Sequence, residues 1–167
     1  GGRTVLISGC IDTQKVHISS AIASGYKYML IVTSDEAKAR KMCDDASFFN
    51  KEAIYYPAKD AIFYSADVHG NQITGERLRC ISRIINHSST GEGVLTVVTT
   101  MDGIADRLIP VERFKEAVIT LDYSSEIEPE KLAKKLVAMG FVRTGMVEDK
   151  GQFAIRGGII DIFSYTD

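Results

Sequence analysis

Short apolar runs separated by helical segments are the feature that most constrains the fold of this 167-residue chain. The runs are rich in β-branched and aliphatic residues, and several are apolar at successive positions, as strands buried on both faces are. Strands are predicted over Thr4–Ile7, Tyr28–Thr33, Ala53–Tyr56 and Val94–Thr99. Because strands and helices alternate, the sequence predicts an α/β fold in which helices flank a parallel sheet on both sides.

Capping residues mark the helices between these strands. Asp12 is predicted to cap a helix that ends before Gly25, and Ser34 to cap the next one. Small apolar residues at helical spacing give this second helix a buried stripe: Ala39, Met42, Cys43 and Ala46. A loop over residues 58–72 follows, and loops of this length are more often functional than not. The remaining helices are predicted over Ile73–Ile85, Met101–Leu108 and Val111–Phe114.

The pattern changes after residue 116, where short elements surround a single helix. Pro129 suits the first turn of this helix, since its missing N–H costs nothing there, and Gly140 ends the helix. Short strands are expected around it, the second and third paired as a hairpin: residues 118–121, 141–147, 151–156 and 159–163. The sequence therefore predicts an α/β domain over residues 1–116 and a small α+β module over residues 117–167.

Composition and charge narrow the possible functions. The formal net charge of -2 provides no general basic field for a nucleic-acid backbone, so any such contact would be local. The three cysteines are widely spaced, which favours a reducing compartment over a disulfide framework, and the three histidines lack metal-ligand spacing. No apolar run approaches the ~20 residues that span a bilayer, and the first residues form no secretory signal. We therefore expect a cytoplasmic protein with no membrane segment and no metal site.

The turn after the first predicted strand has the outline of a phosphate-binding loop. Such a loop needs glycines so that backbone N–H groups can wrap the phosphates, then a lysine, and a serine or threonine for magnesium. Here Gly9 stands alone where two glycines are needed, and Val16 follows Lys15. Asp12 would also place a carboxylate near any bound phosphate. Thr13 and Lys15 keep ATP binding open, but the favoured interpretation is a structural turn that binds no ATP.

Polar groups near the third predicted helix have an ordinary and a functional interpretation. Carboxylates and a histidine in or beside the loop could bind a metal or transfer protons: Asp60, Asp67, His69 and Glu76. Charged residues on the outer face of the helix could contact DNA phosphates, Arg79 and Arg83 being four apart: Glu76, Arg77, Arg79 and Arg83. For both groups a solvated surface is the favoured interpretation.

Residues 151–163 (GQFAIRGGIIDIF) form the strongest candidate for a binding surface. Alternation along the strand turns Phe153 and Ile155 toward the core and Arg156 outward, and Gly157 permits a tight turn. The isoleucines at 159, 160 and 162 are expected to add to the core. Arg143 is expected on the same exposed face as Arg156, where two arginines would suit a partner's carboxylates. The residues alone leave a binding surface and a solvated face equally open, and no catalytic group is predicted.

The segment Phe141–Phe163 resembles the second-domain signature of the repair protein UvrB and of the transcription-repair coupling factor (Mfd) family. It carries their G-x-[FY]-x-x-R-G strand pair and the aliphatic-Asp-aliphatic-Phe run. The loop from Tyr56 through His69 to Leu78 is similar to the coupling-factor form, since it has no room for the long aromatic hairpin of UvrB. Residues 94–114 match the next family segment. The chain is thus identified as an amino-terminal UvrB-like fragment, whose first domain is a degenerate RecA-like subdomain without the ATPase.

This resemblance implies a non-catalytic module that binds UvrA and brings nucleotide-excision repair to stalled RNA polymerase. By position, Arg156 and Arg143 match arginines that face UvrA, supported by Phe153 and Gly157, while Ala154 stands where UvrB-like sequences carry another arginine. It also implies that the full-length protein is an ATP-dependent DNA translocase. Its ATP, magnesium, DNA and RNA-polymerase sites would lie in other domains, with the UvrA surface held against a distant domain.

Two other functions stay open at this point. The first is an ATP-dependent helicase or DNA-binding subunit related to UvrB, which would use the turn around Lys15. The second is a purely architectural module that masks another part of the full-length protein.

Overall fold

The computed structural model describes residues 3–50, 52–59, 68–108, 110–122, 124 and 126–165, with the backbone alone for residues 68–72 and 90. The chain divides into two compact units. The first comprises Gly1–Lys59 and Cys80–Asp106, and the second comprises Asp60–Arg79 and Arg107–Asp167. The division into domains at residue 117 stays a prediction.

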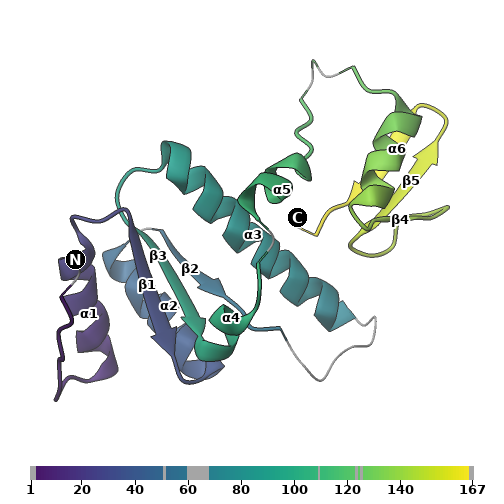
Figure 1. The fold of residues 1–167 in the computed structure, drawn as a ribbon. Helices are drawn as coiled ribbons and strands as arrows, with labels where there is room; N and C mark the ends of the chain where they lie inside the picture. Colours follow the sequence, from purple (N-terminus) through teal and green to yellow (C-terminus); the bar gives the residue numbers. More distant parts are fainter. Residues whose placement is uncertain are drawn as a thin grey trace. The chain divides into compact units, whose positions relative to one another are not determined.

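A parallel sheet forms the centre of the first unit (Figure 1). Its strands are β1 (Tyr28–Thr33), β2 (Ala53–Tyr56) and β3 (Leu95–Thr100), in the order β1-β3-β2. Because β3 pairs with both neighbours, Val97 is in register with Leu30 on one side and with Ile54 on the other. The predicted α/β architecture is therefore confirmed.

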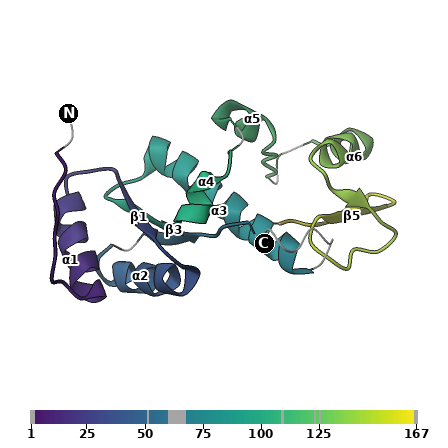
Figure 2. The same cartoon turned by 60° about the horizontal axis from the view of Figure 1, so that its bottom comes forward.

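Helices cover both faces of this sheet, as Figure 2 shows for α2 and α3. α1 (Asp12–Ala23) and α2 (Glu36–Phe49) pack against one face through a buried cluster: Val16, Ala39, Met42, Ala46 and Val98. α3 (Val68–Thr90) packs against the other face through Cys80, which joins a second cluster: Ile54, Tyr56 and Leu95. The buried stripe predicted for α2 is confirmed, since Cys43 also packs against the first cluster.

Short helices follow β3. The side chain of Thr100 caps α4 (Met101–Ala105), because its hydroxyl oxygen accepts a hydrogen bond from the Gly103 N–H at 3.1 Å. A side chain at Gly103 would place its Cβ 2.2 Å from the Thr99 Oγ1. α5 (Val111–Glu116) extends the short turn predicted in this place.

Two of the predicted strands do not form. Thr4–Ile7 is outside both sheets, and Val5 and Leu6 are 72% and 92% exposed. Residues 118–121 also have no strand structure. A run of about four apolar residues does not specify which neighbouring strand it pairs with, so local β-propensity is not sufficient for either one.

Several helix boundaries also differ from the prediction. Ile11 rather than Asp12 is the N-cap of α1, and its N–H donates to the Gln14 Oε1 at 3.2 Å. α3 begins at Val68, inside the predicted loop, and runs to Thr90 rather than ending at Ile85. Helices lengthen cooperatively once nucleated, and the polar residues at both ends of α3 carry no apolar periodicity that reveals this.

Asp35 caps α2, one residue after the predicted Ser34. Its Oδ1 accepts a hydrogen bond from the Lys38 N–H at 2.8 Å, and its Oδ2 accepts one from the Ser34 hydroxyl at 2.9 Å. The Lys38 N–H contributes most, followed by Ser34, to holding the pKa of Asp35 below its ordinary value of 3.8.

An Asp35→Asn variant should lose less stability than the unchanged chain when the pH falls below the ordinary carboxyl pKa of 3.8. A carboxylate whose pKa is lowered by folding stabilises the folded chain above its unfolded-state pKa, and this contribution is lost as the pH falls through the folded-state pKa. Asparagine keeps an acceptor for the Lys38 N–H but does not titrate. Melting temperatures between about pH 5 and pH 2 would test this. Parallel curves for the two proteins would contradict it.

Within the second unit, residues 129–163 form one helix and a small mixed sheet. α6 (Pro129–Ala138) has Pro129 in its first turn, as predicted, and Gly140 follows it with φ +91°. The strands are β4 (Val142–Arg143), β5 (Gln152–Arg156) and β6 (Ile159–Phe163), in the order β4-β5-β6. α6 packs on one face of this sheet through a cluster of buried residues: Leu132, Ala133, Leu136 and Phe153.

The predicted hairpin between residues 141–147 and 151–156 is wrong, because β4 and β5 run parallel. The Val142 N–H donates to the Gly151 carbonyl at 2.8 Å, and the Thr144 N–H donates to the Phe153 carbonyl at 2.9 Å. The Gln152 side chain accepts hydrogen bonds from the backbone N–H groups of residues 148 and 149. The intervening loop is held in a conformation that returns the chain to the start of β4. β5 and β6 are antiparallel, as expected.

Candidate protein-docking surface

The small sheet of the second unit has one face turned away from α6. The register pairs Arg156 with Ile159, Ala154 with Asp161, and Gln152 with Phe163. Since Phe153 lies in the α6 cluster and side chains alternate along a strand, all six residues lie on the opposite face. Val142 joins them because it is in register with Gln152. We call this set the outer face: Val142, Gln152, Ala154, Arg156, Ile159, Asp161 and Phe163.

Arg156 pairs with Asp161 on the outer face. Its Nη2 donates a hydrogen bond to the Asp161 Oδ2. The two residues are diagonal neighbours on adjacent strands, a separation that a long side chain can bridge. The Arg156 side chain is 58% exposed and the Asp161 side chain 37% exposed, so the pair is accessible to a partner. The predicted outward orientation of Arg156 is confirmed.

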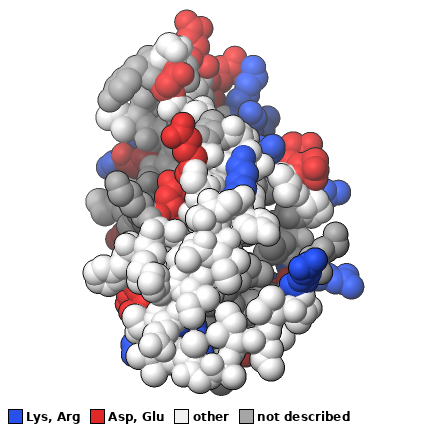
Figure 3. Space-filling view, turned by 90° about the vertical axis from the view of Figure 1, so that its left-hand side faces the viewer, with Lys and Arg blue, Asp and Glu red and all other residues white. Residues whose placement is uncertain are grey.

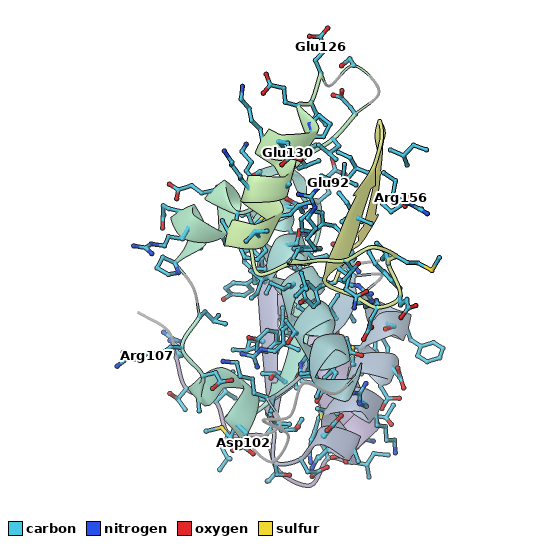
Figure 4. The ribbon with its side chains drawn as sticks, turned by 90° about the vertical axis from the view of Figure 1, so that its right-hand side faces the viewer. Glu92, Asp102, Arg107, Glu126, Glu130 and Arg156 are labelled. Atoms are coloured by element: carbon cyan, nitrogen blue, oxygen red, sulfur yellow. The ribbon has the colours of Figure 1, made fainter. Side chains whose placement is uncertain are left out.

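Arg143 does not share this face, contrary to the expectation from the sequence. It is in register with Phe153, so its side chain lies on the α6 face, where its Nη2 is 3.5 Å from the Glu130 Oε1. Figure 4 shows Glu130 on α6 on one side of the strand and Arg156 on the other. The sequence does not specify the register of β4 against β5, and a shift of one residue in register moves a side chain to the other face.

Phe153 is buried and Gly157 lies in a turn, as expected, while their support of a docking surface stays a prediction. Phe153 is fully buried against α6, and Gly157 makes the turn between β5 and β6 with φ +61°, a conformation that favours glycine. Ile160 and Ile162 pack on the same core, as predicted. Ile159 does not, because its register with Arg156 puts it on the outer face, where it is 63% exposed.

Apolar groups accompany the ion pair on the outer face. Val142 is 60% exposed and Phe163 36% exposed. The Lys150 Nζ lies 5.7 Å from the centroid of the Phe163 ring, within the range of a cation–π contact. Exposed aliphatic and aromatic groups beside an arginine are the composition typical of a protein-binding surface.

The turn before α1 carries its own counter-charge. Gly9 has φ +78° and Thr13 lies in the first turn of α1. The Asp12 Oδ1 is 3.0 Å from the Lys15 Nζ and 3.7 Å from the Lys38 Nζ. The hydrogen bond from Lys15 is the main cause of the lowered pKa of Asp12. Both lysines that could face a phosphate here are thus paired with a carboxylate of the chain.

The surface around α1 is also poor in charge. Figure 3 shows a broad area of the first unit with few lysine, arginine, aspartate or glutamate side chains. Exposed apolar residues on and before α1 include Val5, Leu6, Ile11 and Ile22. An uncharged surface of this kind does not suit the phosphates of a nucleic acid, which are bound by lysine and arginine.

The charged outer face predicted for α3 is only partly observed. Arg77 is 6% exposed, so it is not part of a solvated face, whereas the Arg83 side chain is 51% exposed and lies 3.9 Å from the Glu52 carboxylate. Asp60, Asp67 and the His69 side chain lie outside the described residues. Within the described ranges, no three histidine, cysteine or acidic residues are grouped as metal ligands would be. No helix there is long and apolar enough to cross a membrane.

The structure also shows a buried histidine contact at the end of α3 that no sequence pattern indicates. The His87 side chain is 2% exposed and lies between the Glu52 carboxylate, at 3.3 Å, and the Lys27 carbonyl, at 3.2 Å. Gly91 is required beside it, because a Cβ at that position would be 1.9 Å from the His87 ring. His87 therefore joins α3 to the starts of β1 and β2, which is a structural role.

Comparison with known proteins finds a family model that matches part of the second unit. Residues 119–167, which include α6 and the small sheet, match the family model of the UvrB interaction domain. Nearly the whole chain is also similar to transcription-repair-coupling factors. It is 31% identical over 169 residues to the Bacillus subtilis (strain 168) protein, covering 99% of this chain and 14% of that protein.

Two staphylococcal relatives give the same result. Identity is 30% over 166 residues to the Staphylococcus aureus (strain USA300) transcription-repair-coupling factor and 30% over 169 residues to that of Staphylococcus haemolyticus (strain JCSC1435). Each match covers 98% of this chain and 14% of the relative. The chain is therefore similar to one part of these transcription-repair-coupling factors and spans about one seventh of their length.

Proposed function

We propose that this chain is a recruitment module that binds UvrA, and that the outer face is part of the docking surface. The observation that carries the proposal is the exposed arginine, Arg156, on the outer face of a unit that matches the UvrB interaction domain. An exposed guanidinium among apolar groups suits a partner surface that bears carboxylates. Arg143 is proposed as a second contact, on the α6 face.

The role proposed for the whole protein follows from its relatives. A transcription-repair-coupling factor would bring nucleotide-excision repair to stalled RNA polymerase, with this part recruiting UvrA. We infer that the module itself is non-catalytic and works in the cytoplasm. ATP, magnesium, DNA and RNA polymerase would be bound by other domains, and a distant domain of the same protein would cover the UvrA surface.

Direct titration with purified UvrA tests the proposal. Calorimetry with the whole chain should detect saturable binding that weakens as salt increases, because charged contacts are screened by salt. A longer version of the chain, with more of the second domain, should be tested beside it. If neither version binds, UvrA recruitment by this surface is refuted.

An ATP-binding subunit is the second candidate, since Lys15 and Lys38 both lie close to Asp12 in the first turn of α1. The Asp12 carboxylate between them counts against it, because a phosphate would have to displace that carboxylate. Calorimetric titration with Mg-ATP should therefore show no binding. Micromolar affinity would contradict this prediction and favour a nucleotide-dependent function.

A further inference from the structure

The geometry points to Asp161 as a carboxylate of the chain itself that competes with a partner for Arg156. We propose that Asp161 pairs with Arg156 in the unbound module and thereby lowers the affinity of the outer face for a carboxylate-bearing protein surface. The inference rests on the proposed function, in which that surface belongs to UvrA. Asp161 would then set the strength of docking without making a favourable contact of its own.

The position of Asp161 supports competition. It lies in register with Ala154, so Arg156 reaches it by leaning back along β5 toward Ala154. Ala154 is 1% exposed, and its methyl group leaves space for an arginine above the sheet. A partner that approaches the outer face therefore meets a guanidinium whose charge is already opposed by a neighbouring carboxylate.

The exposure of the ion pair indicates that Asp161 competes with a partner for Arg156 and does not serve to hold Arg156 in place. The Arg156 side chain is 58% exposed and the Asp161 side chain is 37% exposed, so the two form a surface ion pair. Surface ion pairs contribute little to holding either side chain in place. One of the five N–H groups of a guanidinium is used in the contact with Asp161, so a partner carboxylate can still reach Arg156. It would then lie within a few ångströms of Asp161 and be repelled by its charge.

The charges on and beside the outer face indicate that removing the Asp161 charge would increase the affinity for an acidic partner. Asp161 is the acidic member of the outer face, and Arg156 is its basic member. Lys150 contributes a second cation above Phe163. Neutralising Asp161 would therefore leave this face positive, which favours an acidic partner through both the contact and the approach.

The test is to titrate UvrA with the Asp161→Asn chain. Asparagine has nearly the same shape and keeps an acceptor for Arg156, but it carries no charge. Affinity should increase about threefold to tenfold, as expected for removing a like charge near a solvated contact. An Asp161→Ala chain should show a gain of the same sign. Melting temperatures would verify that both variants are folded.

Two control variants test whether the gain in affinity depends on Arg156 and on the position of the removed carboxylate. In an Arg156→Ala background, Asp161→Asn should give no gain, because the competition acts through Arg156. Glu126→Gln, which removes an exposed carboxylate before α6 (labelled in Figure 4), should leave affinity unchanged. A gain from Asp161→Asn that persists without Arg156 would overturn the inference.

The outcomes separate this inference from the proposed function. If the unchanged chain binds UvrA through Arg156 but Asp161→Asn binds equally or more weakly, the inference is wrong and the proposed function stands. If neither the unchanged chain nor its longer version binds UvrA, both are refuted. Tighter binding that requires Arg156 supports both.

Discussion

Replacing Phe153 by alanine should lower the free energy of unfolding of the second unit by about 3–5 kcal/mol, the range for removing a buried aromatic side chain. Phe153 is 0% exposed and contacts the α6 residues Leu132 and Leu136 in a small core. A loss of this size is comparable to the whole stability of a small unit. We therefore expect α6 and the small sheet to unfold in a large fraction of molecules.

Hydrogen exchange followed by mass spectrometry would measure this effect in each unit. Amides of α6, β5 and β6 should lose protection in the Phe153→Ala chain, whereas those of β1 and β3 should keep it, since they belong to a separate core. Ile159→Ala is the matched control, because Ile159 is 63% exposed and its truncation should change stability by less than ~0.5 kcal/mol. Unchanged exchange in the Phe153 variant would show that this core is not what holds the unit together.

Arg156→Glu should weaken UvrA binding by at least ~2 kcal/mol, or about thirtyfold. The substitution removes a charge-assisted contact and replaces it with repulsion from the same partner carboxylate. The fold should remain, because Arg156 is exposed at the end of β5 and its ion pair with Asp161 lies on the surface. Calorimetric titration of UvrA gives the change in affinity, and circular dichroism verifies the fold.

Arg107→Glu is the matched control for this charge reversal. Arg107 is exposed and lies outside α6 and the small sheet (Figure 4), so the same change in net charge should alter affinity only slightly. Arg156→Gln should have an effect of the same sign as Arg156→Glu but smaller, since it removes the attraction without adding repulsion. If Arg156→Glu and Arg107→Glu bind equally well, Arg156 is not a contact.

Elements with a clear apolar pattern were predictable from the sequence. β1, β2 and β3 were placed within one residue, because each is a compact apolar run. α2 was recognised from a stripe that the structure buries. Phe153 and Arg156 were assigned to opposite sides of β5 by simple alternation. In each case the determining interaction is local, so the order of residues along the chain is sufficient.

Failures arose where a distant partner decides the structure. Thr4–Ile7 has the composition of a strand, but composition does not specify a neighbour in the sheet. Arg143 was placed on the wrong face because its orientation depends on which residue of β5 is in register with it. The loop that precedes β5 is held by hydrogen bonds to the Gln152 side chain, which no periodicity reveals. The pairing of Arg156 with Asp161 likewise depends on the register of two strands.

The separation of Arg143 and Arg156 sets a lower limit on the size of any ligand that engages both. A short peptide laid along the outer face would contact Arg156 alone, because Arg143 lies on the α6 face beside Glu130. A ligand that engages both arginines must reach around the small sheet and contact both of its faces. A competitor designed against one face would therefore leave half of the proposed contact available, and a complete inhibitor of this module would have to be a folded protein or a macrocycle.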